Sequence, residues 1–331
     1  MGGLAFNQFK LENGNSTNAQ SESGKVGDFV RNAYAKLKEL QPQEALSCLD
    51  EALRANYEHK EALYAIKCLN WWLEKIKNLE DFPDYYGRAV YLLSQWKAYY
   101  DFLELMNEKF DTCQYAIRQF VYGTALQNFM EVLNEAVLRH DPELLLQVGR
   151  CYKGVGDYEK SLKYLKHAYQ YKKEDGKAIS ELADVYALIG DTKASKGLFR
   201  EAFYIDPLSV EIETLESDMI HRLAENVSDL GFCGDALLER IGVYGALFGV
   251  FSVKRVLKLT EVAKLKQSIF LLENELLTNP QEKNVLVPRL INKYLWLMDH
   301  YENEKDSYSL IEGIKLKIKL IEPSIYERFM R

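Results

Sequence analysis

Apolar residues recur every three or four positions along most of this chain, a spacing that places them on one face of an α-helix. From residue 25 onward, short polar turns separate these stretches, which therefore read as consecutive helix pairs. The chain has seven prolines and no run of alternating β-branched residues, which leaves little room for a β-sheet. The pattern predicts an all-α protein built from antiparallel helix hairpins, about six of them.

An internal repeat lies near the middle of the chain. Residues 145–157 read LLQVGRCYKGVGD, and residues 179–191 read ISELADVYALIGD. Tyr152 and Tyr186 are 34 residues apart, and the other matched pairs have the same spacing. The next stretch repeats as well, with Ser161, Leu165 and Ala168 matching Ser195, Phe199 and Ala202. A fixed period of this length is typical of stacked helical units.

Each matched residue has a physical role in a helix hairpin. Gly156 and Gly190 can adopt the positive φ that ends a first helix. Asp157 and Asp191 can then cap the second helix, and Pro207 closes the second copy because it cannot continue a helix. Small residues let the paired helices approach closely, and large ones fill the neighbouring holes. The small residues are Gly149, Ser161, Ala168, Ala183, Ser195 and Ala202, and the large ones are Tyr152, Leu165, Tyr186 and Phe199.

Between Pro142 and Pro207 the chain closely resembles the tetratricopeptide repeat (TPR) family, whose pattern runs W-x-x-L-G-x-x-Y, then A-x-x-x-F, then P. Leu145 and Ile179 replace the tryptophan, and Lys173 replaces the first copy's proline. The resemblance implies a TPR-like array of antiparallel helix hairpins, a right-handed α-solenoid. Because two units cannot bury their outer faces alone, we expect weaker repeats on both sides.

The second-helix pattern does recur outside the two clear copies. It is found at Ala45-Leu49-Ala52, Ala89-Leu93-Trp96, Ala125-Phe129-Val132 and Ser268-Leu272. We therefore divide the chain into five parts. These are a disordered N-terminal segment (1–24), degenerate helical repeats (25–141), two clear TPR units (142–212), an irregular helical segment (213–284), and a terminal helical hairpin with a tail (285–331).

Composition and charge narrow the class of function. The formal net charge of −7 argues against nucleic acid, which is normally held by a basic face. The five cysteines are scattered without a C-x-x-C pair, which indicates reduced thiols in a cytoplasmic protein. No stretch approaches the roughly 20 apolar residues that span a bilayer, so we expect no integral membrane segment. The N-terminus also lacks the features of a secretory signal.

Familiar catalytic motifs are missing from the sequence. It contains no glycine-rich phosphate loop, no G-x-S-x-G elbow and no H-E-x-x-H motif. No two of the five histidines are four residues apart, the spacing that aims two imidazoles of a helix at one metal ion. We therefore expect a protein that is not an enzyme, with no catalytic residues, no cofactor and no metal.

The tetratricopeptide resemblance implies a concave groove lined by the first helix of each unit. It places there Glu143, Leu146, Arg150, Lys153 and Gly154 from the first unit, and Lys177, Ser180, Asp184, Ala187 and Leu188 from the second. This mixture suits a peptide segment held by side-chain contacts, and two cations beside a leucine favour an acidic-apolar one. The alternative is that these are ordinary solvated helix positions.

A glycine-rich apolar stretch, Ile241–Val253, reads IGVYGALFGVFSV and precedes several basic residues. Placed on one helix, Gly242, Gly245 and Gly249 share a side, and each costs about 1 kcal/mol in helix propensity. A sequence keeps such glycines where another backbone comes close. The stretch is either a buried helix of the array, an oligomer or partner interface, or a membrane-surface helix with a basic flank.

Taken together, the residues favour a cytoplasmic adaptor or scaffold that binds a segment of another protein in a concave TPR groove. Two rival functions stay open. One is a peptide-sensing regulator or a chaperone for an unassembled client. The other is an accessory subunit of an envelope or membrane-associated complex, docked through the glycine-rich stretch and its basic flank.

Overall fold

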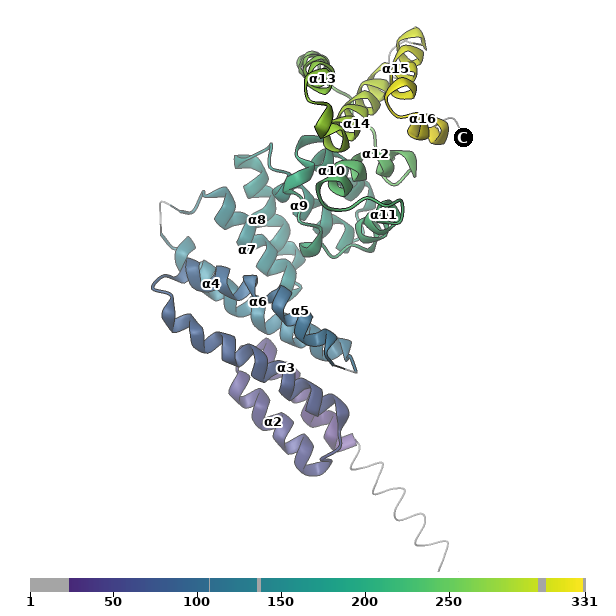
Figure 1. Ribbon diagram of the computed structural model, residues 1–331. Coiled ribbons are helices and arrows are strands. Elements are labelled where there is room, and N and C mark those ends of the chain that lie inside the picture. The colour runs from purple at the N-terminus through teal and green to yellow at the C-terminus, as the bar shows by residue number, and fades with distance from the viewer. Residues whose placement is uncertain (1–23, 107, 136–137, 303–307, 330–331) are drawn as a thin grey trace, which may run out of the picture. The chain divides into compact units, whose positions relative to one another are not determined.

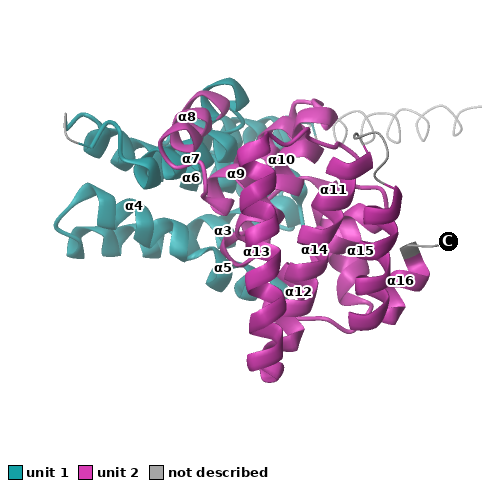
Figure 2. Ribbon diagram, turned by 90° about the horizontal axis from the view of Figure 1, so that it is seen from above, with its two compact units in different colours: residues 1–161 teal, residues 162–331 magenta. Residues whose placement is uncertain are grey.

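The computed structural model describes residues 24–106, 108–135, 138–302 and 308–329. These residues form α-helices and short 3-10 helices, with no β-strand among them (Figure 1), which confirms the all-α class. The segment predicted to be disordered, residues 1–24, lies almost wholly outside the described residues. The chain divides into two compact units, residues 1–161 and 162–331 (Figure 2).

Unit 1 is a stack of helices around an aromatic core. Its elements are a helix over residues 24–38, α2 (Pro42–Ala55), α3 (Lys60–Lys77), η1 (Asn78–Asp81), α4 (Tyr85–Ser94), α5 (Trp96–Glu104), α6 (Asp111–Leu133), α7 (Pro142–Val155) and the beginning of α8 (Tyr158–Tyr171). Helix α2 packs on α3, and α6 packs on α3, α4 and α7. The rings of Trp72, Trp96 and Tyr99 meet with centroids 4.9 to 5.6 Å apart. Such T-shaped and tilted pairs stabilise the core beyond their buried area.

Unit 2 contains the rest of α8 and all later elements. These are α9 (Gly176–Leu188), α10 (Thr192–Ile205), η2 (Pro207–Ser209), η3 (Ile212–Thr214), α11 (Asp218–Ser228), α12 (Gly234–Leu247), α13 (Leu259–Thr278), η4 (Pro280–Glu282), α14 (Lys283–Glu302), α15 (Tyr308–Ile321) and α16 (Pro323–Phe329). Helix α9 packs on α10, and α12 packs on both α10 and α14. Helices α13 and α15 also contact α14, as Figure 2 shows.

The turns of the internal repeat have the geometry that their sequence predicts. Gly156 after α7 and Gly190 after α9 have φ values of +86° and +85°. The Asp157 side chain accepts a hydrogen bond from the backbone N–H of Lys160, at 3.1 Å. Asp191 accepts the equivalent bond from the third residue after it, at 3.0 Å. Both copies therefore end the first helix with a left-handed glycine and cap the second with a carboxylate.

Small residues lie where the paired helices meet. Ser161 and Ala202 are fully buried, and the Ser161 hydroxyl donates to the carbonyl oxygen of Gly149 over 2.8 Å. Helix α10 ends at Ile205, two residues before the buried Pro207. The close approach therefore leaves no room for larger side chains at these positions.

We expect the substitution Ala202→Leu to reduce the free energy of unfolding by about 1–3 kcal/mol, because the added carbons overpack the α9–α10 contact. Denaturant unfolding followed by far-UV circular dichroism measures this. The matched control is Lys193→Leu, at an exposed position of the same helix, which should stay within about 0.5 kcal/mol of wild type. Equal midpoints for the two variants would contradict the packing.

The prediction of one helix over Ile241–Val253 is wrong. Helix α12 ends at Leu247, and Gly249 follows in a left-handed turn with φ +69°. The chain then turns back, so that the Phe251 N–H donates to the Gly245 carbonyl over 2.8 Å. Apolar spacing alone could not reveal this turn. The residues after it, such as Phe251, fold back onto the end of α12 and are as apolar as the residues of a continuing helix would be.

The glycines of this helix are needed for close packing inside unit 2. A Cβ on Gly242 would lie 2.4 Å from Nδ2 of Asn292, and a Cβ on Gly245 would lie 2.3 Å from the Phe251 ring. Residues Glu239 to Gly245 are buried. The part of the stretch from Ile241 to Gly245 is thus a buried helix, as one of the alternatives expected, whereas Phe248 and Gly249 are exposed. The closest atoms to an added Cβ at Gly242 or Gly245 belong to side chains.

Two further boundaries differ from the pattern. Ala89 and Leu93 lie in α4, but Trp96 begins α5, because the helix is interrupted at Gln95. From Pro323, in the part predicted to be a tail, the chain forms the additional short helix α16. Proline is compatible with the first turn of a helix, where its missing N–H is not needed.

Candidate functional site

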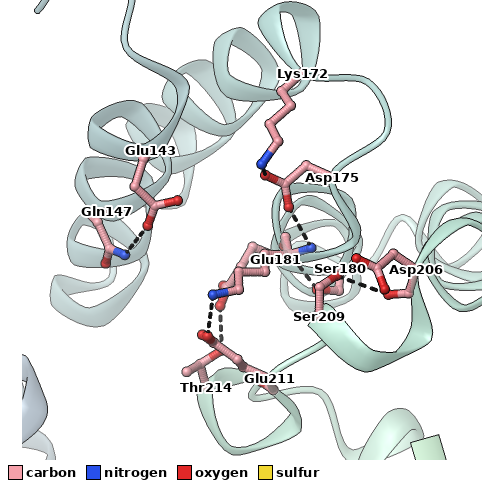
Figure 3. Close-up of polar contacts among 11 residues, drawn as sticks. Glu143, Gln147, Lys172, Asp175, Ser180, Glu181, Asp206, Ser209, Glu211 and Thr214 are labelled. Carbon is pink, nitrogen blue, oxygen red and sulfur yellow. Dashed lines mark hydrogen bonds and ion pairs between the residues drawn. The ribbon is translucent and has the colours of Figure 1, made fainter.

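On α7, the predicted groove residues differ in their access to solvent. Glu143 is exposed and accepts a hydrogen bond from Nε2 of Gln147 over 2.9 Å (Figure 3). Leu146, Arg150 and Lys153 are only 1%, 9% and 3% exposed. A ligand in solution could not reach two cations buried to this degree. The acidic-apolar ligand inferred from them therefore has no support from this helix.

Gly154, also assigned to the groove, lies at a tight contact within unit 1. A Cβ at this position would lie 2.2 Å from the ring of Tyr122 on α6. The repeat pattern assigns Gly154 to a helix face, but it cannot show that the Tyr122 side chain covers this position.

On α9, the predicted groove face holds a following segment of unit 2. Lys177 forms an ion pair with Glu211 at 2.8 Å. Next to it, the Thr214 hydroxyl donates to Glu181 over 2.5 Å, as Figure 3 shows. The residues that carry η2 and η3 thus lie along α9 and are held by its polar side chains.

Asp184 and Ser180 are buried on the same helix. The Asp184 carboxylate accepts hydrogen bonds from the backbone N–H groups of Glu216 and Ser217 at 2.8 to 3.0 Å. The Ser180 hydroxyl donates to the carbonyl oxygen of Lys177. Ala187 and Leu188 are half-buried and line a small cavity of about 440 Å³. Asp184 therefore anchors the chain that leads into α11.

We expect the substitution Asp184→Ala to lower the free energy of unfolding by about 1.5–3 kcal/mol, because buried backbone N–H groups lose a charged acceptor. Asp184→Asn should cost less, since one side-chain oxygen remains. Thermal melts of both variants measure this difference. If Asp184→Ala melted at the wild-type temperature, the anchoring role would be refuted.

A larger cavity, of about 1190 Å³, lies within unit 1 and was not predicted from the sequence. Helix α6 supplies the largest share of its wall. The end of α7 with the start of α8, the end of the helix over 24–38 and α4 supply the rest. We call it the α6 cavity. Its lining residues are Lys38, Leu40, Tyr85, Gln119, Gly123, Leu126, Gln127, Asn128, Met130, Glu131, Tyr152, Val155, Gly156, Asp157, Tyr158 and Glu159.

Leu40 lines the α6 cavity in a conformation that non-glycine residues rarely adopt. Its φ is +60°, in the left-handed region, at the turn where the clear repeats have glycine. Its side chain lies against Gly123, where an added Cβ would be 2.7 Å from Leu40 Cδ2. Strain of this kind costs about 1–3 kcal/mol and persists where its surroundings require it. Here the leucine side chain covers α6 at the edge of the cavity.

The polar lining of the α6 cavity is rich in hydrogen-bond acceptors. Nε2 of Gln119 donates to the Val155 carbonyl over 3.1 Å, and Nδ2 of Asn128 donates to the Thr124 carbonyl over 2.9 Å. These internal bonds use amide donors and leave the side-chain oxygens as acceptors. Glu131 and Glu159 add two exposed carboxylates to the lining.

The third carboxylate of the lining, Asp157, is tied to the repeat turn. Its Oδ2 lies 2.8 Å from the Lys160 ammonium group. Burial raises the pKa of Asp157, but hydrogen bonds from the side chain and backbone N–H of Lys160 lower this pKa by a larger amount. The net pKa lies below the ordinary value of an aspartate, so this carboxylate stays ionised near neutral pH.

Sequence reasoning missed the α6 cavity because the residues around it come from four separate segments. One local signal was available: Leu40-Gln41 occupies a hairpin turn at which the clear repeats have Gly-Asp. A leucine at a position that favours glycine indicates that the side chain itself is needed there.

Comparisons with known proteins add no relative. No protein-family model matches the chain, and no curated protein is significantly similar to it in sequence. Among the described residues, no helix is both long and apolar enough to cross a bilayer. The same residues hold no cluster of histidine, cysteine and carboxylate groups arranged to bind a metal ion.

Proposed function

We propose that this protein is an interaction module of tetratricopeptide type, with its hairpins continuing as a right-handed α-solenoid, and that it works as an adaptor or scaffold in the cytoplasm. The observation that carries the proposal is the α6 cavity, with half-buried apolar side chains beside exposed polar groups. Ligand sites are typically concave, mostly apolar and supplied with a few convergent polar groups.

A peptide segment suits this cavity better than a compact small molecule. Its volume of about 1190 Å³ exceeds the roughly 300–1,000 Å³ of ordinary small-molecule pockets. Helical-repeat proteins use extended surfaces of this kind to hold segments of other chains. The apolar residues would contact the anchoring side chains of the segment, and the amide oxygens would accept hydrogen bonds from its backbone.

A substitution that obstructs the opening of the α6 cavity tests the proposal. Gln127 is exposed on α6, so Gln127→Trp should obstruct the cavity without disturbing the core. We expect wild-type protein to enrich a set of peptides from a random phage-displayed library, and Gln127→Trp to lose at least tenfold in affinity for them. The matched control, Gln43→Trp on the exposed face of α2, should bind as wild type does. If no peptide were enriched in a way that depends on Gln127, the proposal would fail.

A second candidate function, the accessory subunit of a membrane-associated complex, has one supporting observation. Phe270 and Leu277 on α13 are 62% and 81% exposed, in a helix that also carries Lys264 and Lys266. An apolar stripe with basic neighbours is typical of helices that lie on anionic lipid. Flotation with anionic vesicles at low salt tests this function, and a protein that stays with the unbound fraction would exclude it.

A further inference from the structure

We propose that the segment held in the α6 cavity is cationic, with lysine or arginine side chains next to an apolar anchor. This inference rests on the proposed function and specifies the chemistry of its partner. The proposed ligand has the opposite charge to the acidic-apolar segment that the sequence predicted from Arg150 and Lys153, because both of those residues are buried.

Two carboxylates of the cavity lining are left without a counter-charge. Glu131 on α6 and Glu159 in the first turn of α8 are exposed, and neither has an ion-pair partner among the described residues. Two other carboxylates of unit 1 are paired. Glu39 and Glu44 both bind Lys36, at 3.1 and 2.9 Å. Glu131 and Glu159 have no such ion pair among the described residues, so the cavity carries available negative charge.

The other charges of the lining do not cancel these two carboxylates. Asp157 is already paired with Lys160, and Lys38 is the one basic residue of the cavity lining in the described part of the chain. Glu131 and Glu159 against the single ammonium group of Lys38 leave a net negative charge at a concave surface. Such a surface attracts basic segments and raises their association rate, more strongly at low ionic strength.

Hydrogen-bonding capacity points to the same ligand chemistry. One amide N–H each of Gln119 and Asn128 donates to a backbone carbonyl, and the side-chain oxygens of both residues are acceptors. Lysine and arginine side chains carry only donors, which match these oxygens and the carboxylates of Glu131 and Glu159. An acidic segment would bring further acceptors and like charge, and both are unfavourable here.

Apolar side chains of the lining provide the anchor site. Leu126, Met130 and Val155 are half-buried, so part of each faces the cavity. Methionine adapts its shape to different apolar partners. A leucine or aromatic side chain of the segment could therefore be buried between them, while flanking cations reach Glu131 and Glu159. The resulting recognition pattern is an apolar residue with basic residues on either side.

The test uses the full chain and peptides enriched from the random phage-displayed library. We expect the peptides whose binding depends on Gln127 to carry more lysine and arginine than aspartate and glutamate. Replacing their basic residues by glutamine should weaken binding about tenfold in fluorescence anisotropy, and raising the salt concentration should weaken the parent peptide more than the glutamine version.

A charge-reversal pair of variants makes the test specific. Glu131→Lys together with Glu159→Lys should weaken the basic peptides at least tenfold and improve binding of versions with glutamate at the same positions. The matched control reverses Glu58 and Glu80, two exposed carboxylates outside the cavity lining, and changes the net charge equally. It should leave affinity within about twofold, since distant surface charges are screened.

The outcomes separate this inference from the proposed function. Enriched peptides that are neutral or acidic, yet lose binding with Gln127→Trp, would overturn the cationic ligand and leave peptide binding at the cavity intact. Equal binding of basic peptides to wild type and to the Glu131→Lys, Glu159→Lys variant would overturn it too. A library that yields no Gln127-dependent peptide would defeat the proposed function itself.

Discussion

Replacing Arg289 with methionine should lower the free energy of unfolding of unit 2 by about 3–5 kcal/mol, because it leaves the Glu239 carboxylate buried without its counter-charge. Arg289 Nε lies 3.0 Å from Oε1 of Glu239, and a second guanidinium nitrogen contacts the same oxygen. Glu239 is completely buried between α12 and α14, whereas Arg289 remains partly accessible to water. Denaturant unfolding at neutral pH measures the loss.

A double variant and a pH series test the electrostatic cause. Burial raises the pKa of Glu239, and Arg289 lowers it in part. The folded state therefore binds this proton more tightly than the unfolded chain, so the associated stability is present at low pH and is lost as pH rises through the folded pKa. Without Arg289 the folded pKa rises further, and the deficit of the variant should shrink as pH falls from 7 toward 5.

The double variant Glu239→Met, Arg289→Met should recover most of the loss at neutral pH, because a buried ion pair can be replaced by apolar side chains of similar volume at little cost. A single Arg289→Met variant that lost less than about 1 kcal/mol would show that the carboxylate is not held as the structure describes.

The repeat turns could be predicted because everything that determines them is local. Only a few consecutive residues determine each turn: a glycine in the left-handed conformation ends one helix, and an aspartate caps the N–H three residues later. The same local rules act at Gly156 and Gly190, whose φ values agree within 1°. The all-α class followed in the same way from the spacing of apolar residues.

The candidate site could not be predicted in the same way, because burial depends on residues that are distant in the sequence. Arg150 and Lys153 are charged and lie on one helix face, so sequence reasoning treated them as surface donors. In the structure both are buried. Asp184 was expected to face a ligand, but it accepts backbone hydrogen bonds from residues more than thirty positions later. Nothing in the repeat pattern encodes that loop.

The α6 cavity illustrates the other limit of sequence reasoning. It is bounded by residues from 38 to 159, and no contiguous motif marks it. Charge composition gave only the overall excess of carboxylates. Glu131 and Glu159 become notable because they lie at a concave surface without an ion-pair partner in the described part of the chain, and only the three-dimensional arrangement shows this.

The substitution Gly242→Ala should lower the free energy of unfolding by about 2–4 kcal/mol, which combines overpacking with a disturbed buried hydrogen bond. The new Cβ would lie 2.4 Å from Asn292 Nδ2 and 3.3 Å from the Phe203 carbonyl oxygen. These two groups are hydrogen-bonded to each other at 2.9 Å, and Asn292 is itself buried. Asn292 would have to move away, which would leave a buried carbonyl and amide without their partners.

A glycine-to-alanine substitution at a less crowded position of unit 2 provides the control. Gly197 lies inside α10, and a Cβ there would meet its nearest neighbour, Val253 Cγ1, at an ordinary 3.5 Å. Gly197→Ala should therefore stabilise the protein by up to about 1 kcal/mol through the higher helix propensity of alanine. Opposite shifts in the denaturation midpoint are expected for the two variants. If Gly242→Ala were also stabilising, helix propensity would dominate and the close contact between α12 and Asn292 would not exist.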